Sequence, residues 1–248
     1  MPVMRLVIIF GSLCLGLTIW QLVVTLTGVP RFILPGPALV LSTIWKSRTL
    51  LAEHALITIS EVMIGLTLGI FLGALSAIGL ASSKVANAML RPILVFSQAI
   101  PVFALAPLLT LWLGYGLWSK IVMALLIIYF PVTSAFFDGL MRTPRDWLDL
   151  AHVMRATPLQ IMWRVRIPAA LPGLASGVRL AAVYAPSGAI IGEWVGASKG
   201  LGYLMLLANG RAKIDLMFAA LIVLAIFTLL LHALVDYGCR RGLAAHRG

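Results

Sequence analysis

The chain has 248 residues, of which 61% are hydrophobic and only 11% charged, and its formal net charge is +11. Soluble domains carry about 25% charged residues, so this composition excludes an ordinary soluble domain and indicates a membrane protein. Basic loops held on the cytoplasmic side of a bilayer explain the positive charge better than a nucleic-acid partner, which we do not expect. Cys14 and Cys239 have neither metal-site nor disulfide-framework spacing.

Residues 6–26 form the first predicted transmembrane span. This apolar stretch is too long for the core of a signal peptide, and no small-residue cleavage site follows it, so we expect an uncleaved helix. A turn-rich break runs from Pro30 to Pro37. The amphipathic segment 38–51, which carries Lys46 and Arg48, is expected to lie at the membrane interface.

Five further spans are predicted, at residues 55–81, 93–113, 121–140, 172–195 and 216–237. Gly65, Gly69 and Gly73 recur every fourth residue in the second span, a spacing that lets a neighbouring helix approach closely. Proline near mid-depth is expected to break three of the six spans. Such breaks are tolerated where protein or a water-filled cavity satisfies the freed carbonyl groups.

Six spans place both termini on the same side of the membrane. With the N-terminus inside, 11 of the 19 Lys and Arg residues fall on the inner side, seven fall on the outer side, and Arg179 lies within a span. This bias predicts that both termini and the loop 141–171 are cytoplasmic.

The loop 141–171 is the most charged part of the chain and is predicted to fold into two short helices. Thr143-Pro144 indicates one helix start, with Thr143 as N-cap and Asp146 at the capping-box position. Thr157-Pro158, with Gln160 three residues after the threonine, indicates a second start. Pro168 and Pro172 are expected to end the second helix. A basic loop with local helix is the alternative interpretation.

No catalytic or metal site is predicted. The chain has no HExxH, Walker lysine or GxSxG motif, and His54, His152, His232 and His246 are scattered. Glu61 and Glu193 are expected near the outer face and Arg179 near the inner face, where each can reach toward headgroups or a cavity. An ion-driven carrier would be expected to place a carboxylate deeper. We therefore expect a partner, docked on the cytoplasmic helix pair, to supply the energy.

Two motifs in the cytoplasmic loop resemble the EAA loop of ABC-importer permeases. They are Asp149-Leu150-Ala151 and the segment from Ile167-Pro168 to Leu171-Pro172. Leu34-Pro35-Gly36-Pro37, the third span and the segment from Glu193 to Tyr203 resemble the nitrate/sulfonate/taurine branch of that family. The resemblance covers residues 34–235. It implies an all-α membrane protein with six transmembrane helices, a type I ABC importer permease, formed by a single domain over residues 1–248.

The resemblance also implies partners and functional positions. In the family the loop forms a coupling helix that fits a groove on a cytoplasmic ABC ATPase dimer, which uses ATP and Mg, while the permease itself binds no cofactor. A solute-binding protein outside, a second permease copy and a location in the bacterial inner membrane are implied as well. The corresponding coupling positions here are Asp149, Leu150, Ala151, Arg155, Ala156, Ile167 and Pro168.

Two of these coupling positions depart from the family pattern. Asp149 replaces the usual Glu, and Arg155 replaces a glycine between the two short helices. Thr157-Pro158 can supply the break in place of the glycine, or Arg155 can contact a carboxylate of the partner.

Within the branch, Ser97-Gln98, Phe137-Asp138-Gly139-Leu140, Tyr184 and Gly202-Tyr203 resemble permeases for pyrimidine precursors of thiamine. Permeases for aliphatic sulfonates, taurine or nitrate are the alternative, and an ion-gradient-driven secondary carrier is the alternative of another class. We identify no cation at mid-depth that would receive an anion. The expected path residues, whose aromatic members can instead simply pack between helices, are Gln98, Pro101, Phe103, Phe130, Tyr184 and Glu193.

Overall fold

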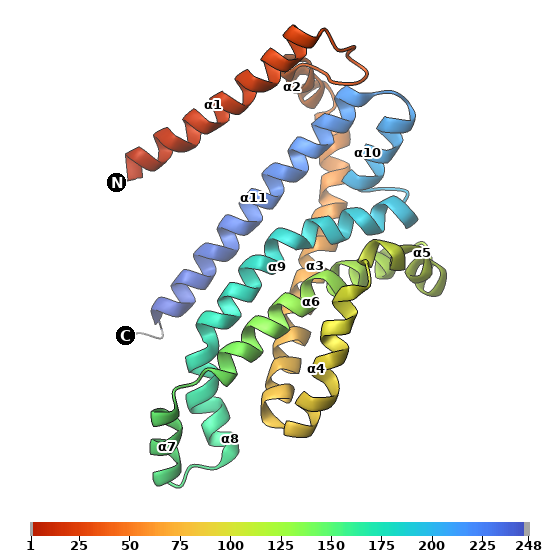
Figure 1. The fold of residues 1–248 in the computed structure, drawn as a ribbon. Helices are drawn as coiled ribbons and strands as arrows, with labels where there is room; N and C mark the ends of the chain where they lie inside the picture. Colours follow the sequence, from red (N-terminus) through yellow and green to blue (C-terminus); the bar gives the residue numbers. More distant parts are fainter. Residues whose placement is uncertain (1, 246–248) are drawn as a thin grey trace.

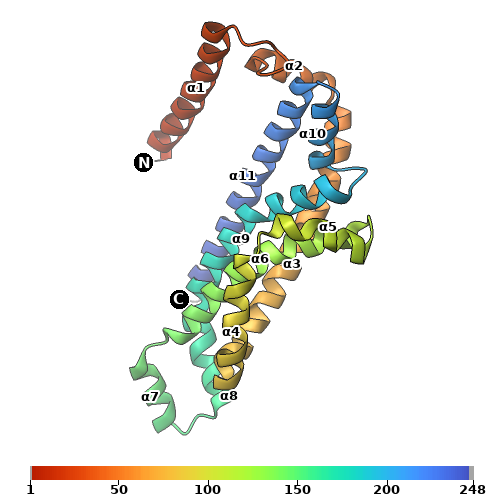
Figure 2. The same cartoon turned by 45° about the vertical axis from the view of Figure 1, so that its right-hand side comes forward.

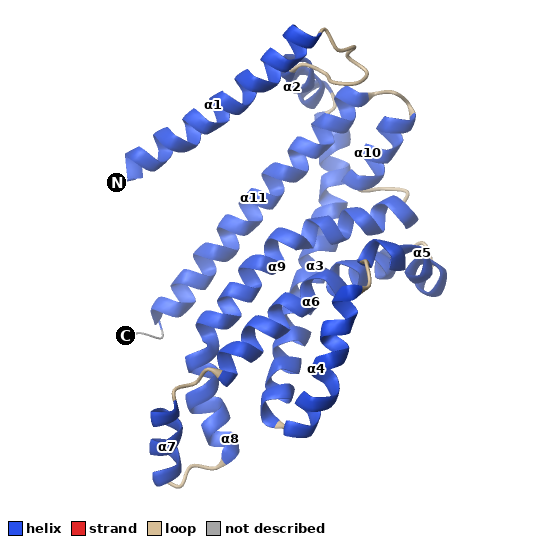
Figure 3. Ribbon diagram, viewed as in Figure 1, coloured by secondary structure: helices blue, strands red, loops and turns tan. Residues whose placement is uncertain are grey.

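The structure is a computed structural model and describes residues 2–245, so His246 lies outside the described residues. This part of the chain is helical and contains no strand (Figures 1 and 3). The helices are α1 (Pro2–Thr27), α2 (Pro37–Lys46), α3 (Arg48–Ser82), α4 (Lys84–Ala99), α5 (Val102–Leu113), α6 (Leu117–Met141), α7 (Arg145–Val153), α8 (Pro158–Ile161), α9 (Ile167–Gly196), α10 (Leu201–Gly210) and α11 (Ile214–Ala245).

Helices α3, α6, α9 and α11 form the body of the molecule, whose core contains Val62, Ala124, Ile128 and Ala185. The glycine stripe of α3 packs on α6: a Cβ atom added at Gly69 would lie 2.7 Å from Ile128 Cγ2. The close-packing role predicted for these glycines is therefore confirmed. Lipid tails are as apolar as the helix side chains, so helices in a membrane gain no hydrophobic driving force from associating. Close van der Waals packing of this kind holds them together instead.

Four helical stretches are long and apolar enough to cross a membrane, namely Arg48–Ser82, Leu117–Met141, Pro158–Gly196 and Ile214–Ala244. Of the three spans that proline was expected to break, the span 93–113 is broken, because α4 and α5 form a pair bent by 100°, whereas Pro131 and Pro186 lie inside continuous helices. The bend falls at Ile100-Pro101, where proline has no N–H to continue the helix. The apolar helix α1 stands apart from the body in Figures 1 and 2, and Trp20 stacks on Phe218 of α11.

The prolines predicted to end the second short helix do not end it. Residues Pro158–Gly196 form one continuous helical stretch, in which the π-helical turn Met162–Arg166 joins α8 to α9. Pro168 occupies the first turn of α9, and Pro172 and Pro186 lie inside that helix. Pro131 likewise lies inside α6. Among packed membrane helices, neighbouring groups and local π-type turns accommodate the backbone group that proline frees.

Glu61 and Glu193 were predicted to reach toward headgroups or a cavity, but both are buried inside the protein and neither lines the cavity beside α6 and α9. Lys120, expected in an outer loop, lies in α6 and donates from Nζ to Glu61 Oε1 at 2.8 Å. Lys120 is 7% exposed and Glu61 0% exposed, so this ion pair joins α6 to α3 away from water. Arg179, half-buried, binds Asp236 of α11 at 2.7 Å.

Helix α10 occupies a segment that was predicted to be an external loop. Its N-terminus is fixed by Glu193, which is 1% exposed and accepts the N–H of Gly202 at 2.5 Å. Thr58 of α3 donates to Glu193 Oε1 at 2.6 Å and accepts the N–H of Leu201 at 2.8 Å. A side chain at Gly200 would collide with the Glu193 carboxylate. The glycines of this segment thus permit the buried carboxylate to bind the first amides of α10.

We expect Lys120→Met to destabilise the protein strongly, by roughly 3–5 kcal/mol, because it leaves Glu61 buried without its partner. Combining it with Glu61→Gln removes both charges and should recover part of the loss. Denaturant unfolding of purified protein in detergent, followed by tryptophan fluorescence, measures the effect. Lys199→Met, at an exposed position, is the matched control. A Lys120→Met protein as stable as the control would contradict the structural role of the pair.

Candidate functional site

The helix pair, defined here as α7 and α8 and predicted to be cytoplasmic, lies beyond one end of α6 and α9 (Figure 1). Thr143 does not cap α7 as predicted. It is buried, and its Oγ1 donates to the Leu140 carbonyl at 3.0 Å, so Pro144 holds the N-cap position. The capping box of α8 is confirmed: Gln160 N–H donates to Thr157 Oγ1, and Thr157 N–H donates to Gln160 Oε1 at 2.8 Å.

The turn between α7 and α8 is made by Arg155, whose φ is +56°. Its N–H donates to the His152 carbonyl, and the N–H of Ala156 donates to the Ala151 carbonyl at 3.0 Å. The left-handed conformation costs an L-residue roughly 1–2 kcal/mol and suits glycine. Glycine is the residue at this position in the family pattern that the loop resembles. Arg155 therefore makes the turn despite its side chain, which is exposed to solvent.

The helix pair exposes an apolar surface. Leu150 is 61% exposed, and Trp147, Val153, Met154, Leu159 and Trp163 are exposed with it. Ala151 is only 7% exposed and lines a groove of about 540 Å³ between α7 and the start of α9. Asp149 and Pro168 are exposed, and Ala156 and Ile167 half-buried. All seven predicted coupling positions thus lie at one end of the molecule, beside an apolar surface of the kind that marks a partner interface.

The second feature is a cavity of about 580 Å³ between the α4–α5 bend, α6 and α9, called the central cavity below. Three of the predicted path residues, Gln98, Phe130 and Tyr184, line it together. The rest of its lining is Val102, Ile127, Pro131, Ser134, Ala135, Asp138 and Leu180. The structure therefore brings an amide, a phenol and an aromatic ring from three helices to one hollow.

Three other predicted path residues do not line the central cavity. Pro101 sits at the bend as N-cap of α5, and Phe103 is an exposed residue of α5. Glu193 is buried against α10.

Sequence reasoning did not select Ser134 and Asp138 as path residues, although both line the cavity. Their spacing from Phe130, at four and eight residues along α6, was the available signal, because such residues share one helix face.

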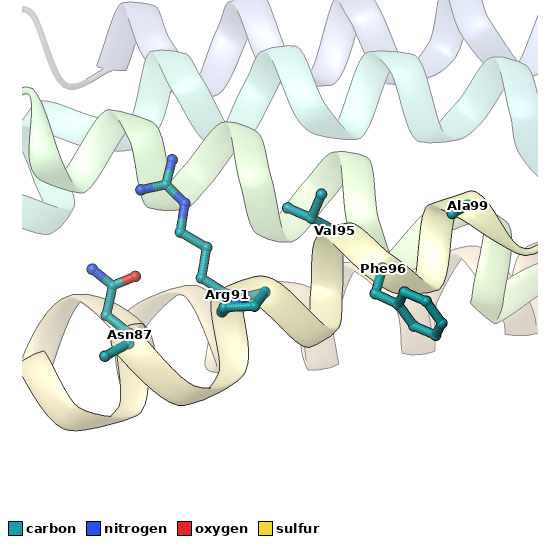
Figure 4. A pocket seen from close by; sticks show the side chains of 7 residues that line it. Asn87, Arg91, Val95, Phe96 and Ala99 are labelled. Atoms are coloured by element: carbon teal, nitrogen blue, oxygen red, sulfur yellow. The ribbon is translucent and has the colours of Figure 1, made fainter.

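Arg91 of α4 borders two neighbouring hollows. The larger, about 850 Å³, is an open face lined by α4 residues alone, including Asn87 and Phe96 (Figure 4). The smaller, about 80 Å³, is lined by both Arg91 and Asp138. The Arg91 guanidinium carbon lies 5.4 Å from the centre of the Phe137 ring of α6. Among the described residues, no three His, Cys, Asp or Glu side chains gather as a metal site would require.

The bundle of apolar helices with a bent pair, a helix pair at one end and a cavity between its helices is the architecture of a membrane transport protein. Residues 65–241 match the family of binding-protein-dependent transport system inner membrane components, and the chain belongs to this family. It is therefore a multi-pass permease subunit of an ABC importer.

Three curated relatives cover most of the chain. A probable ABC transporter permease protein of Haemophilus influenzae is 53% identical over 89% of this chain and 90% of its own length. The formylaminopyrimidine transport permease protein of Halalkalibacterium halodurans is 39% identical over 75% of each chain. The riboflavin transport system permease protein of Chloroflexus aurantiacus is 40% identical over 90% of this chain and 84% of its own.

A solved structure supports the fold. A chain of the methionine ABC transporter MetNI, in an inward-facing conformation, superposes with a TM-score of 0.69 over 79% of this chain and 97% of that chain, at 22% identity. The predicted all-α fold of a type I importer permease is confirmed.

We expect Arg155→Gly to be more stable than Arg155→Ala by about 1 kcal/mol, because both remove the side chain but only glycine relieves the left-handed backbone. Unfolding midpoints in detergent measure this difference. Solute uptake then tests whether the Arg155 side chain contacts a carboxylate of the partner. Unchanged uptake in both variants means that it makes no such contact. Equal stability of the two variants would contradict the strain at this turn.

Proposed function

We propose that this permease carries a pyrimidine precursor of thiamine across the inner membrane, as part of an ATP-driven, binding-protein-dependent importer. The observation that carries the proposal is the meeting of Gln98, Phe130 and Tyr184 around the central cavity. A flat nitrogen heterocycle offers a face to the aromatic ring and edge groups to the amide and hydroxyl. Two relatives support the choice, since their names give formylaminopyrimidine and riboflavin, both nitrogen heterocycles, as solutes.

The energy would come from a cytoplasmic ABC ATPase dimer that binds ATP and Mg, with no cofactor held by this chain. The ATPase would dock on the exposed apolar surface of α7 and α8, around Leu150. Because Pro158–Gly196 is one helical stretch, a displacement of α8 passes directly into α9. Tyr184 lies on α9, so the same displacement reshapes the central cavity.

The proposal also includes the orientation of the chain, the solute-binding protein and a second permease copy. Both termini and the helix pair would be cytoplasmic, and a solute-binding protein would deliver its solute at the opposite end, near α10. A second copy of this chain would close the open side of the central cavity and complete the path. Sulfonate, taurine or nitrate transport within the same family is the second candidate.

Uptake by the reconstituted assembly tests the proposal. In liposomes containing the permease, its ATPase and its binding protein, we expect ATP-dependent uptake of labelled hydroxymethylpyrimidine and much slower uptake of taurine. The permease alone should transport neither solute under an ion gradient. Transport by the permease alone would instead establish a secondary carrier, and faster taurine uptake would favour the sulfonate candidate.

Substitutions in α7 test the docking surface separately. Leu150→Glu should insert and fold normally, because Leu150 is 61% exposed, but should lose the co-purifying ATPase and at least tenfold of the uptake. Leu150→Met keeps the apolar contact and is the matched control. Ala151→Glu should leave insertion intact and also abolish uptake, because a charge at this 7% exposed position would force the helix pair apart. Normal uptake in Leu150→Glu would refute the docking assignment.

A further inference from the structure

The Asp138 carboxylate is set apart from the other acidic side chains of the chain, all of which lie within the described residues. Glu61, Glu193, Asp215 and Asp236 each have a hydrogen-bonding side-chain or backbone partner. Glu53, Asp146 and Asp149 are exposed. Asp138 is half-buried in α6, lines the central cavity, and its carboxylate has no hydrogen bond or ion pair within residues 2–245. It therefore supplies a hydrogen-bond acceptor to the cavity lining that no described protein group uses.

Among the described residues, no cation forms an ion pair with this carboxylate. Arg91 borders the small adjoining hollow with Asp138, yet no ion pair joins them in the described structure. In Figure 4 the Arg91 side chain extends from α4 toward α6, where its guanidinium lies against Phe137. The lining of the central cavity contains Asp138 but no Lys, Arg or His. Its formal charge is thus negative, although the whole chain carries +11.

The position of Asp138 places that charge at one end of the cavity. It lies on α6 three residues before the helix ends at Met141, toward the helix pair. From Ile127 to Asp138 the helix rises roughly 16 Å, at about 1.5 Å per residue, which is enough to accommodate one heterocyclic ring and its substituents. Phe130 and Ser134 lie between, so a ring face and a hydroxyl precede the carboxylate along the same side of α6.

We propose that Asp138 is a specificity-determining residue of the central cavity, which accepts solutes bearing an N–H donor or a cationic group beside an aromatic ring and disfavours anions. The carboxylate binds the donor with a charge-assisted hydrogen bond, while the ring lies against Phe130. A sulfonate in the same place meets a like charge without a compensating cation. This inference rests on the proposed function and extends it from a solute to the residue that selects its chemical class.

The test measures binding by the permease–ATPase complex in detergent without the binding protein, which would otherwise dominate selection. Equilibrium dialysis at millimolar concentration uses labelled hydroxymethylpyrimidine, whose ring carries an amino group, and ethanesulfonate, which has no amino group, as the anionic probe. Asp138→Asn keeps the size of the side chain and removes its charge. Glu53→Gln removes the same charge from an exposed position of α3 and is the matched control. Co-purification of the ATPase at the wild-type yield shows that each variant is folded.

We expect Asp138→Asn to weaken pyrimidine binding about tenfold, the order expected for losing one hydrogen bond to a charged group, and Glu53→Gln to leave it unchanged. Wild-type complex should bind ethanesulfonate at least tenfold more weakly than the pyrimidine, and Asp138→Asn should narrow that difference in affinity. Equal pyrimidine binding by wild type and Asp138→Asn overturns the inference. Binding of neither probe by the wild type, or equal binding of both, also overturns it.

Failure of the proposed solute is detected separately by uptake in the complete assembly. If the assembly imports another amino-bearing heterocycle in place of the pyrimidine, the proposed solute is wrong, and the same comparison of variants with that heterocycle decides the role of Asp138. If the assembly imports taurine, and its binding does not depend on residue 138, both proposals fail.

Discussion

A polar group inside a bilayer has no water to bind, so it must find its partners within the protein, and this constraint organises the fold. Lys120 and Glu61 join α6 to α3, Arg179 and Asp236 join α9 to α11, and Glu193 joins α9 to the start of α10. The two ion pairs connect residues 59 and 57 positions apart in the sequence, and Thr58 of α3 also donates to Glu193. Together these interactions join α3, α6, α9, α10 and α11 inside the bundle.

Two features of the backbone shape the cavity and its connection to the helix pair. The 100° bend between α4 and α5 opens space beside α6, and the central cavity forms there. The unbroken stretch Pro158–Gly196 runs from the helix pair along the same cavity. The π-helical turn Met162–Arg166 lies between the two parts of this stretch, and such turns are often found at functional sites. The proposed docking surface and the cavity therefore share one helical stretch, through which the proposed displacement of α8 would reach the cavity.

Local signals in the sequence were sufficient for some of this structure but not for the rest. The capping box of Thr157 and Gln160 and the glycine stripe of α3 depend on residues within a few positions of one another, and both were predicted. The Lys120–Glu61 pair spans 59 residues, so each residue alone suggested a position near the membrane surface. The prolines misled because their effect depends on packing: Pro101 bends the chain, whereas Pro172 and Pro186 are accommodated within α9. Gln98, Phe130 and Tyr184 were selected by residue type, while Asp138 required the cavity to be seen.

The distribution of charge explains why a strongly basic protein can suit a solute that is not an anion. Most of its described Lys and Arg residues lie in loops and at helix ends, and the predicted orientation of the chain in the membrane rests on their distribution. Lys120 and Arg179, which lie within α6 and α9, are bound to carboxylates. The cavity is thereby left with an amide, hydroxyls, an aromatic ring and one carboxylate. The net positive charge therefore relates to the predicted orientation of the protein in the bilayer. The class of solute that the cavity binds depends, in our proposal, on the unpartnered carboxylate of Asp138.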